Sequence, residues 1–250
     1  MRRITMLASM VFGAAAMMAG PIAGSAEISK GDLENGKKIF TEGKGAVPAC
    51  TSCHGEDGMG NDMMGTPRLA GQVSQFLVKQ LEDFANDKRM DTTMYVMNAN
   101  AKAMSLQDRV DVAIYVNSLP ADGNYSNLDE LKANGTQVGL PYLGKIVVNF
   151  GIEEKGVPAC KSCHGFNGRG VDPLFPKLNK QKYVYLVNQL KKWRDGSRAN
   201  DPMSQMQIVA RNLSDADINN AAAYLAAAPE TTMGNTRTPE MHMPMAYDPH

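Results

Sequence analysis

The sequence predicts an all-α fold that consists of two tandem modules, each built from short helices. A repeat gives the two modules: residues 47–50 (VPAC) recur at 157–160, and Pro67-Arg68-Leu69 recurs as Pro176-Lys177-Leu178. Apolar residues spaced three and four apart over residues 73–84 and 184–193 predict one amphipathic helix in each half. No long alternating pattern of apolar and polar residues predicts a strand.

Further helices can be placed in the same order in each half. Helices are expected over residues 33–41 and 142–150. A last helix is expected after Ser105 and after Ser214, because each serine is followed three residues later by an aspartate, and each helix should end before a proline. The predicted organisation is a module at residues 27–120, a linker at 121–138, and a second module at 139–229.

All four cysteines lie in two copies of the pattern C-x-x-C-H. Cys50 and Cys53 precede His54, while Cys160 and Cys163 precede His164. This pattern is typical of c-type haem attachment, in which two thiols bind the haem covalently and the histidine binds its iron. A structural zinc site would need a four-ligand set, and a thioredoxin-like pair would need only one such motif. We therefore predict two covalently bound haem c groups, which would supply much of the core that modules of this size lack.

The axial position opposite each histidine decides the chemistry of the iron. The chain has four histidines, and the two outside the motifs lie at positions 242 and 250, so bis-histidine ligation of both haems is disfavoured. Methionine is the natural candidate, because an M-x-x-M pair recurs at the same place in both modules. The pairs are Met94/Met97 and Met203/Met206. Spacing alone leaves open which member of each pair binds the iron.

The two ends of the chain are expected to lie outside the modules. Residues 1–26 resemble a secretory signal peptide, since Arg2 and Arg3 precede an apolar stretch that small residues follow. A membrane anchor is the rival interpretation, but Gly20, Pro21 and Gly24 interrupt the apolar run. Residues 230–250 are expected to form a disordered, methionine-rich tail. Its residues 241–245 (MHMPM) could bind copper(I), although an accidental composition is the simpler interpretation.

Charge excludes one class of partner. The 26 basic and 26 acidic residues give a formal net charge of zero, so there is no basic footprint for nucleic acid.

Several stretches resemble class I cytochromes c, and residues 31–229 resemble the dihaem periplasmic "c-four" subfamily. The similar stretches are residues 67–72 (PRLAGQ), 79–84 (KQLEDF), 198–203 (RANDPM) and 213–217 (LSDAD). The resemblance implies two class I cytochrome c domains, with Met97 and Met206 as the second iron ligands. It also implies that the carbonyl groups of Pro67 and Pro176 accept hydrogen bonds from the iron-bound histidines.

The resemblance further implies a periplasmic electron-transfer protein rather than an enzyme. Its redox partners would be a terminal oxidase, a membrane reductase complex or a periplasmic dehydrogenase, and peripheral association with the membrane is compatible with that role. One alternative is an electron-accepting subunit of a periplasmic dehydrogenase. Another is a dihaem peroxidase or thiosulfate-oxidising enzyme. A peroxidase is disfavoured by the lack of a further histidine in residues 27–229.

Overall fold

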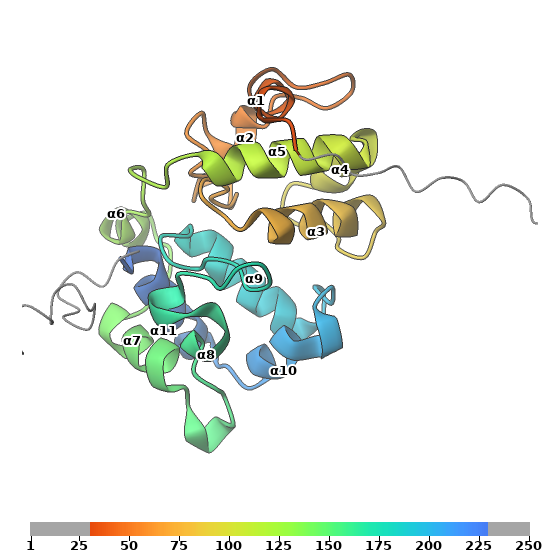
Figure 1. Cartoon of the computed structure of the whole chain (residues 1–250). Helices are drawn as coiled ribbons and strands as arrows, with labels where there is room; N and C mark the ends of the chain where they lie inside the picture. Colours follow the sequence, from red (N-terminus) through yellow and green to blue (C-terminus); the bar gives the residue numbers. More distant parts are fainter. Residues whose placement is uncertain (1–30, 230–250) are drawn as a thin grey trace, which may run out of the picture.

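The two halves of the chain form two groups of helices that lie against each other (Figure 1). The computed structural model describes residues 31–229, so the predicted signal peptide and the predicted tail with its copper hypothesis lie outside the described residues. Residues 31–229 contain helices and four isolated β-bridges but no strand. The predicted all-α fold is confirmed for this part of the chain. None of its helices has the length and apolar character needed to cross a membrane.

The N-terminal module has five helices. They are α1 (Leu33–Glu42), α2 (Thr51–His54), α3 (Ser74–Ala85), α4 (Met97–Ala103) and α5 (Leu106–Ser118). The C-terminal module repeats this order. Its helices are α7 (Pro141–Phe150), α8 (Lys161–His164), α9 (Tyr183–Asp195), α10 (Gln205–Arg211) and α11 (Asp215–Ala227), with short 3₁₀ turns at Glu153–Lys155, Phe166–Gly168 and Pro202–Ser204.

The predicted linker contains an additional helix, α6 (Leu128–Ala133). The Asn127 side chain accepts a hydrogen bond from the backbone N–H of Glu130 and so caps this helix. Leu131 is buried in the hydrophobic cluster of the C-terminal module. The bounds of the modules and of the linker stay a prediction.

The last helix of each module begins as the sequence predicts. Ser105 and Asp108 form a capping box at the start of α5, and Ser214 and Asp217 form one at the start of α11. In each box the serine hydroxyl accepts from the aspartate N–H, and the aspartate carboxylate accepts from the serine N–H.

The first and last helices of each module cross at a glycine. A Cβ atom on Gly36 of α1 would lie 2.1 Å from the Asp111 carbonyl oxygen of α5. A Cβ atom on Gly144 of α7 would lie 1.9 Å from the Asn220 carbonyl oxygen of α11. The two backbones therefore approach so closely that no larger residue fits at either crossing.

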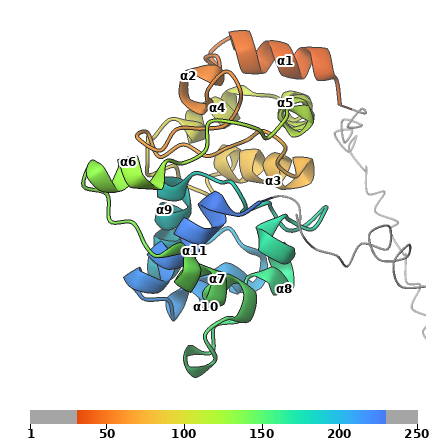
Figure 2. The same ribbon diagram turned by 90° about the vertical axis from the view of Figure 1, so that its left-hand side faces the viewer.

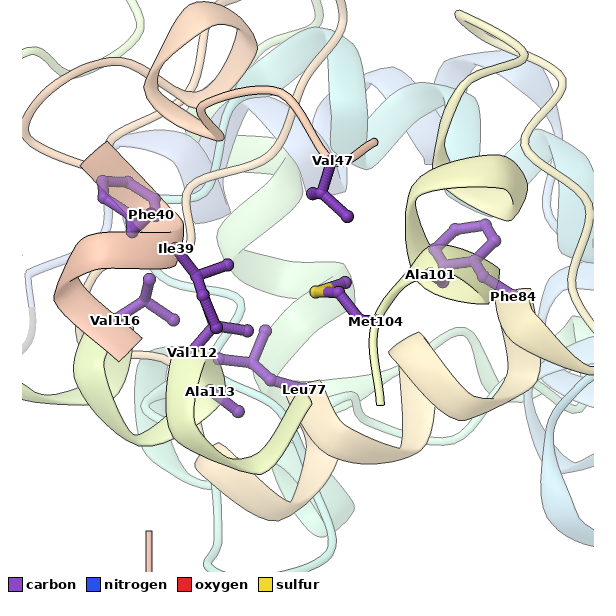
Figure 3. Packing of buried hydrophobic residues seen from close by; sticks show 10 residues of the cluster. All are labelled: Ile39, Phe40, Val47, Leu77, Phe84, Ala101, Met104, Val112, Ala113 and Val116. Atoms are coloured by element: carbon purple, nitrogen blue, oxygen red, sulfur yellow. The ribbon is translucent and has the colours of Figure 1, made fainter. Parts of the chain in front are cut away.

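Apolar side chains from several helices form the core of the N-terminal module. In Figure 3, Ile39 and Phe40 of α1 lie close to Val112 and Val116 of α5. Leu77 and Phe84 of α3 add to the same cluster. Cys50 and Met97 also pack against this core, so a haem attached at Cys50 would be in contact with it.

The two modules meet through α3 and α9, which lie at the junction in both views (Figures 1 and 2). The residues that cross this junction occupy equivalent positions in the repeat. Gln72 of the first module binds the backbone of Lys177, and Gln181 of the second module binds the backbone of Arg68. The modules thus contact each other through the same face.

Candidate haem-binding sites

Each C-x-x-C-H motif folds into a one-turn helix that presents a buried histidine. His54 and His164 are 6% and 7% exposed. Their Nδ1 atoms lie 3.0 Å from the Pro67 carbonyl oxygen and 2.9 Å from the Pro176 carbonyl oxygen, respectively. Because a carbonyl oxygen can only accept, Nδ1 carries the proton in both rings. Nε2 is therefore the unprotonated nitrogen, which is the form that binds a metal ion.

Gly60 holds the proline segment next to its histidine. Its N–H donates to the His54 carbonyl oxygen at 2.8 Å, with φ at +73°. A Cβ atom at Gly60 would lie 2.5 Å from the Pro67 carbonyl carbon. Only glycine combines this left-handed backbone with this close approach. Gly170 makes the equivalent hydrogen bond to His164, at 2.7 Å.

Burial sets the protonation of the motif residues. It lowers the pKa of His54 and of His164, so both imidazoles are neutral near pH 7. Burial also raises the pKa of the Cys50 and Cys160 thiols to about 11 in each case. The four cysteines are not paired as disulfides. A raised thiol pKa is the opposite of what a catalytic redox cysteine needs, which agrees with rejecting a thioredoxin-like pair.

The two methionines of each M-x-x-M pair differ in exposure. Met94 and Met203 are 38% and 81% exposed, whereas Met97 and Met206 are half-buried. Met97 also packs against the N-terminal core.

An aspartate carboxylate binds the backbone at the start of the helix that carries Met97 and of the helix that carries Met206. The Asp91 carboxylate accepts from the backbone N–H of Met97 at 3.2 Å, and that of Asp201 accepts from the N–H of Met206 at 2.6 Å. Burial would raise the pKa of Asp91, but hydrogen bonds from four backbone N–H groups outweigh it and lower the pKa. Both aspartates therefore fix the backbone at the methionine that the family resemblance implies as the iron ligand in their module.

Two buried arginines lie at the junction between the modules. Arg89 and Arg198 are 8% and 7% exposed, and both donate to the side-chain oxygens of Gln80 and Gln189. Within residues 31–229 neither guanidinium forms an ion pair with a carboxylate. Burial, followed by the positive charge of Arg89, lowers the pKa of Arg198 to about 9.

Tyr185 lies beside the two arginines and responds to their charge. Arg89 Nη2 donates to the Tyr185 hydroxyl at 3.1 Å. Burial would raise the pKa of Tyr185, but the positive charges of Arg89 and Arg198 outweigh it and lower the pKa. The junction therefore carries buried positive charge, which an anion bound there would stabilise.

These residues fit two haem groups. Each module has a pair of thiols beside a neutral histidine, and the junction has cations that haem propionates could neutralise. Asp91, Asp201, Arg89 and Arg198 were not predicted from the sequence as site residues. A signal was available for the arginines, since they occupy equivalent positions in the repeat. None was available for the aspartates, because Asp201 aligns with Thr92 and not with Asp91.

Comparison with known proteins identifies the family. The cytochrome c family model matches residues 33–120 and 157–229. A thiosulfate dehydrogenase electron acceptor from Stutzerimonas stutzeri (strain A1501) is 36% identical over 212 residues, which is 82% of this chain and 93% of that protein. Cytochrome c4 from Stutzerimonas stutzeri is 32% identical over 191 residues, which is 73% of this chain and 86% of that protein.

Solved structures agree with this assignment. Reduced recombinant cytochrome c4 from Pseudomonas stutzeri has a TM-score of 0.64 and 30% identity, over 80% of this chain and 100% of that chain. The thiosulfate dehydrogenase TsdBA from Marichromatium purpuratum has a TM-score of 0.72 and 31% identity, over 80% of this chain. This chain spans 41% of that longer chain. The protein is an electron carrier with two covalent haem c groups, and it belongs to the cytochrome c family as a dihaem member similar to cytochromes c4 and to electron acceptors of thiosulfate dehydrogenase.

Proposed function

We propose that this chain accepts electrons from a periplasmic thiosulfate-oxidising dehydrogenase. The observation that carries the proposal is the 36% identity to a thiosulfate dehydrogenase electron acceptor, which extends over 93% of that relative. A second such acceptor, from Thiomonas intermedia (strain K12), is 38% identical over 72% of this chain. The dehydrogenase would be a separate protein, and this chain would supply electron transfer without catalysis.

Each iron in the proposal has one histidine and one methionine ligand. These are His54 with Met97 in the first module, and His164 with Met206 in the second. The protonated Nδ1 and free Nε2 of both histidines support the histidine assignment. The lower exposure of Met97 and Met206 compared with Met94 and Met203 supports the choice within each pair.

The ligands fit a carrier better than a catalyst. When bound, haem c supplies a one-electron iron couple, and a thioether ligand favours a higher potential than a second imidazole would. His54 and His164 are buried and are held by hydrogen bonds to the proline carbonyl groups, and Asp91 and Asp201 hold the methionine backbones. Rigid ligands would keep the reorganisation on electron transfer small, and a histidine together with a methionine on each iron would leave no open position for substrate.

The test is direct reduction of the purified holoprotein. A pyridine haemochrome assay should first give two haems per chain. Stopped-flow spectroscopy should then show rapid reduction by thiosulfate when a thiosulfate dehydrogenase is present in catalytic amount, and none with thiosulfate alone. Failure of the enzyme to reduce this protein, while it reduces a known acceptor in the same buffer, would refute the proposed partner.

A freely diffusing carrier for other partners is the second candidate. It is favoured by the similarity to cytochrome c4, whose structure this chain matches over 100% of that chain. Its acceptors would include a terminal oxidase or a membrane reductase complex. The two candidates differ in complex formation. A dehydrogenase partner predicts co-elution with the dehydrogenase on size exclusion, whereas the free carrier predicts separate elution and equally fast reduction by unrelated donors.

Matched substitutions test the methionine ligands. Met97→Leu and Met206→Leu should each remove half of the weak near-infrared band of ferric iron–methionine bonding. Met94→Leu and Met203→Leu, three residues earlier in the chain and more exposed, should leave the band unchanged. Loss of the band in Met94→Leu but not in Met97→Leu would reverse the assignment.

Export to the periplasm is part of the same proposal. Residues 1–26 support it by their sequence alone. Mass spectrometry of the protein from a periplasmic extract tests it, since a chain that begins at Glu27 is the expected product. A full-length chain retained in the membrane fraction would instead favour the anchor.

A further inference from the structure

We propose that Gln72 and Gln181 are positioning residues, each of which tunes the iron-bound histidine of the other module. The proposal rests on the proposed ligation by His54 and His164. It would make the two haem potentials depend on the junction between the modules.

The argument begins with one peptide group in the first module. The Pro67 carbonyl accepts from His54 Nδ1–H at 3.0 Å. The N–H of the same peptide group belongs to Arg68, and it donates to Gln181 Oε1 at 2.6 Å. One peptide group thus joins the histidine of the first module to a glutamine of the second.

The second module has the reciprocal arrangement. The Pro176 carbonyl accepts from His164 Nδ1–H at 2.9 Å. The N–H of that peptide group belongs to Lys177 and donates to Gln72 Oε1 at 2.7 Å. The chain therefore contains the same connection twice, once in each direction across the junction.

Each glutamine is fixed in place by further hydrogen bonds. Gln181 Nε2 donates to the Arg68 carbonyl oxygen at 3.0 Å, and Gln72 Nε2 donates to the Lys177 carbonyl oxygen at 2.8 Å. Each amide oxygen also accepts from the N–H of its own next residue. Both glutamines are 3% exposed, so water does not compete for these bonds.

Hydrogen bonds in such a chain strengthen one another. A peptide N–H that donates makes the carbonyl of the same group a better acceptor, by about 10–30% per bond. A stronger acceptor at the histidine Nδ1–H makes the imidazole a stronger electron donor to the metal. Stronger donation stabilises ferric over ferrous iron. Each glutamine should therefore lower the potential of the haem in the opposite module.

The test uses four single substitutions in the holoprotein. Gln181→Leu and Gln72→Leu remove all three hydrogen bonds of the glutamine side chain, two of them across the junction, and keep a side chain of similar size. Potentials would be measured by spectroelectrochemistry, with each haem identified by NMR contacts to its own module. Trp193, the one tryptophan in the chain, marks the second module.

The expected result is a crossed pattern. Gln181→Leu should raise the potential of the haem at His54, and Gln72→Leu that of the haem at His164. The expected size is about threefold in the equilibrium constant for reduction, or about 28 mV, since tenfold corresponds to 59 mV for one electron. A rise in the haem of the substituted module, an equal rise in both, or no change in either would overturn the proposal.

A second, more conservative pair of substitutions tests the proposal if a leucine variant does not fold. Gln181→Asn and Gln72→Asn keep the amide but withdraw it by one methylene. In the reduced protein, the Nδ1–H proton resonance of the opposite histidine should move upfield while that of the other stays in place. An unmoved resonance, or movement in the substituted module, would also overturn the proposal.

Failure of the underlying ligation by His54 and His164 is recognised separately. The unmodified protein would then lack the low-spin spectrum of a histidine-bound haem.

Discussion

The substitution Asp108→Asn tests how a buried carboxylate stabilises the N-terminal module. The Asp108 side chain is 9% exposed and lies in the first turn of α5. Its carboxylate accepts from Lys44 Nζ at 2.6 Å, Ser105 Oγ at 2.8 Å and Asn35 Nδ2 at 3.2 Å. Burial would raise the pKa of Asp108, but these hydrogen bonds outweigh it and lower the pKa from 3.8 to about 2. The folded state therefore favours the ionised carboxylate.

The magnitude follows from the difference between the two pKa values. One pKa unit corresponds to about 1.4 kcal/mol, so the ionised carboxylate contributes about 2 kcal/mol to the free energy of unfolding at pH 7. Because the folded pKa is depressed, this contribution is complete above the unfolded pKa and is lost as the pH falls through the folded pKa. At pH 3 it should have fallen to about 1 kcal/mol. Asparagine keeps the shape of the side chain but has no charge to titrate.

Guanidinium unfolding of the holoprotein, followed by far-UV circular dichroism at pH 7 and pH 3, measures the effect. Amide exchange in α1 and α5 assigns it to the N-terminal module. Asp217→Asn, in the equivalent capping box of α11, is the matched control and should weaken protection in the C-terminal module instead. The reasoning is wrong if Asp108→Asn costs the same at both pH values, because the lost stability would then not come from the charge.

Three further outcomes are expected. Gly144→Ala should destabilise the C-terminal module by about 1–3 kcal/mol, measured as a lowered Tm, because the new Cβ would meet the Asn220 carbonyl oxygen at 1.9 Å. Asp201→Asn should weaken the near-infrared iron–methionine band of the haem in the C-terminal module, because the N–H of Met206 loses its charged acceptor at 2.6 Å. Lys102→Ala should change the free energy of unfolding by less than about 0.5 kcal/mol, because its ion pair with Asp87 is half-exposed.

Local patterns in the sequence predicted most of the secondary structure. Ser105 and Ser214 each begin a helix because the aspartate three residues on completes a capping box, and this signal lies within four residues. The helix α6 was missed because six residues are too few to show periodicity. Its cap at Asn127 was visible, but a single cap does not establish a helix.

The contacts at the junction could not be predicted in the same way. Gln72 and Gln181 recur in the repeat, but their partners are Lys177 and Arg68, which lie more than 100 residues away in the chain. No periodic pattern encodes a pairing between distant residues. The haem motifs were recognisable because attachment chemistry requires the cysteines and the histidine to be adjacent.

The reciprocal contacts at the junction limit how further modules could be added to such a chain. The two modules meet like the subunits of a symmetric dimer, each using the same face, and such a contact is closed. A third tandem module would have no free copy of this face to bind, because each of the two existing modules already uses its own copy. Chains that lengthen by this contact should therefore add modules in pairs, whereas an odd module would need a different surface to dock.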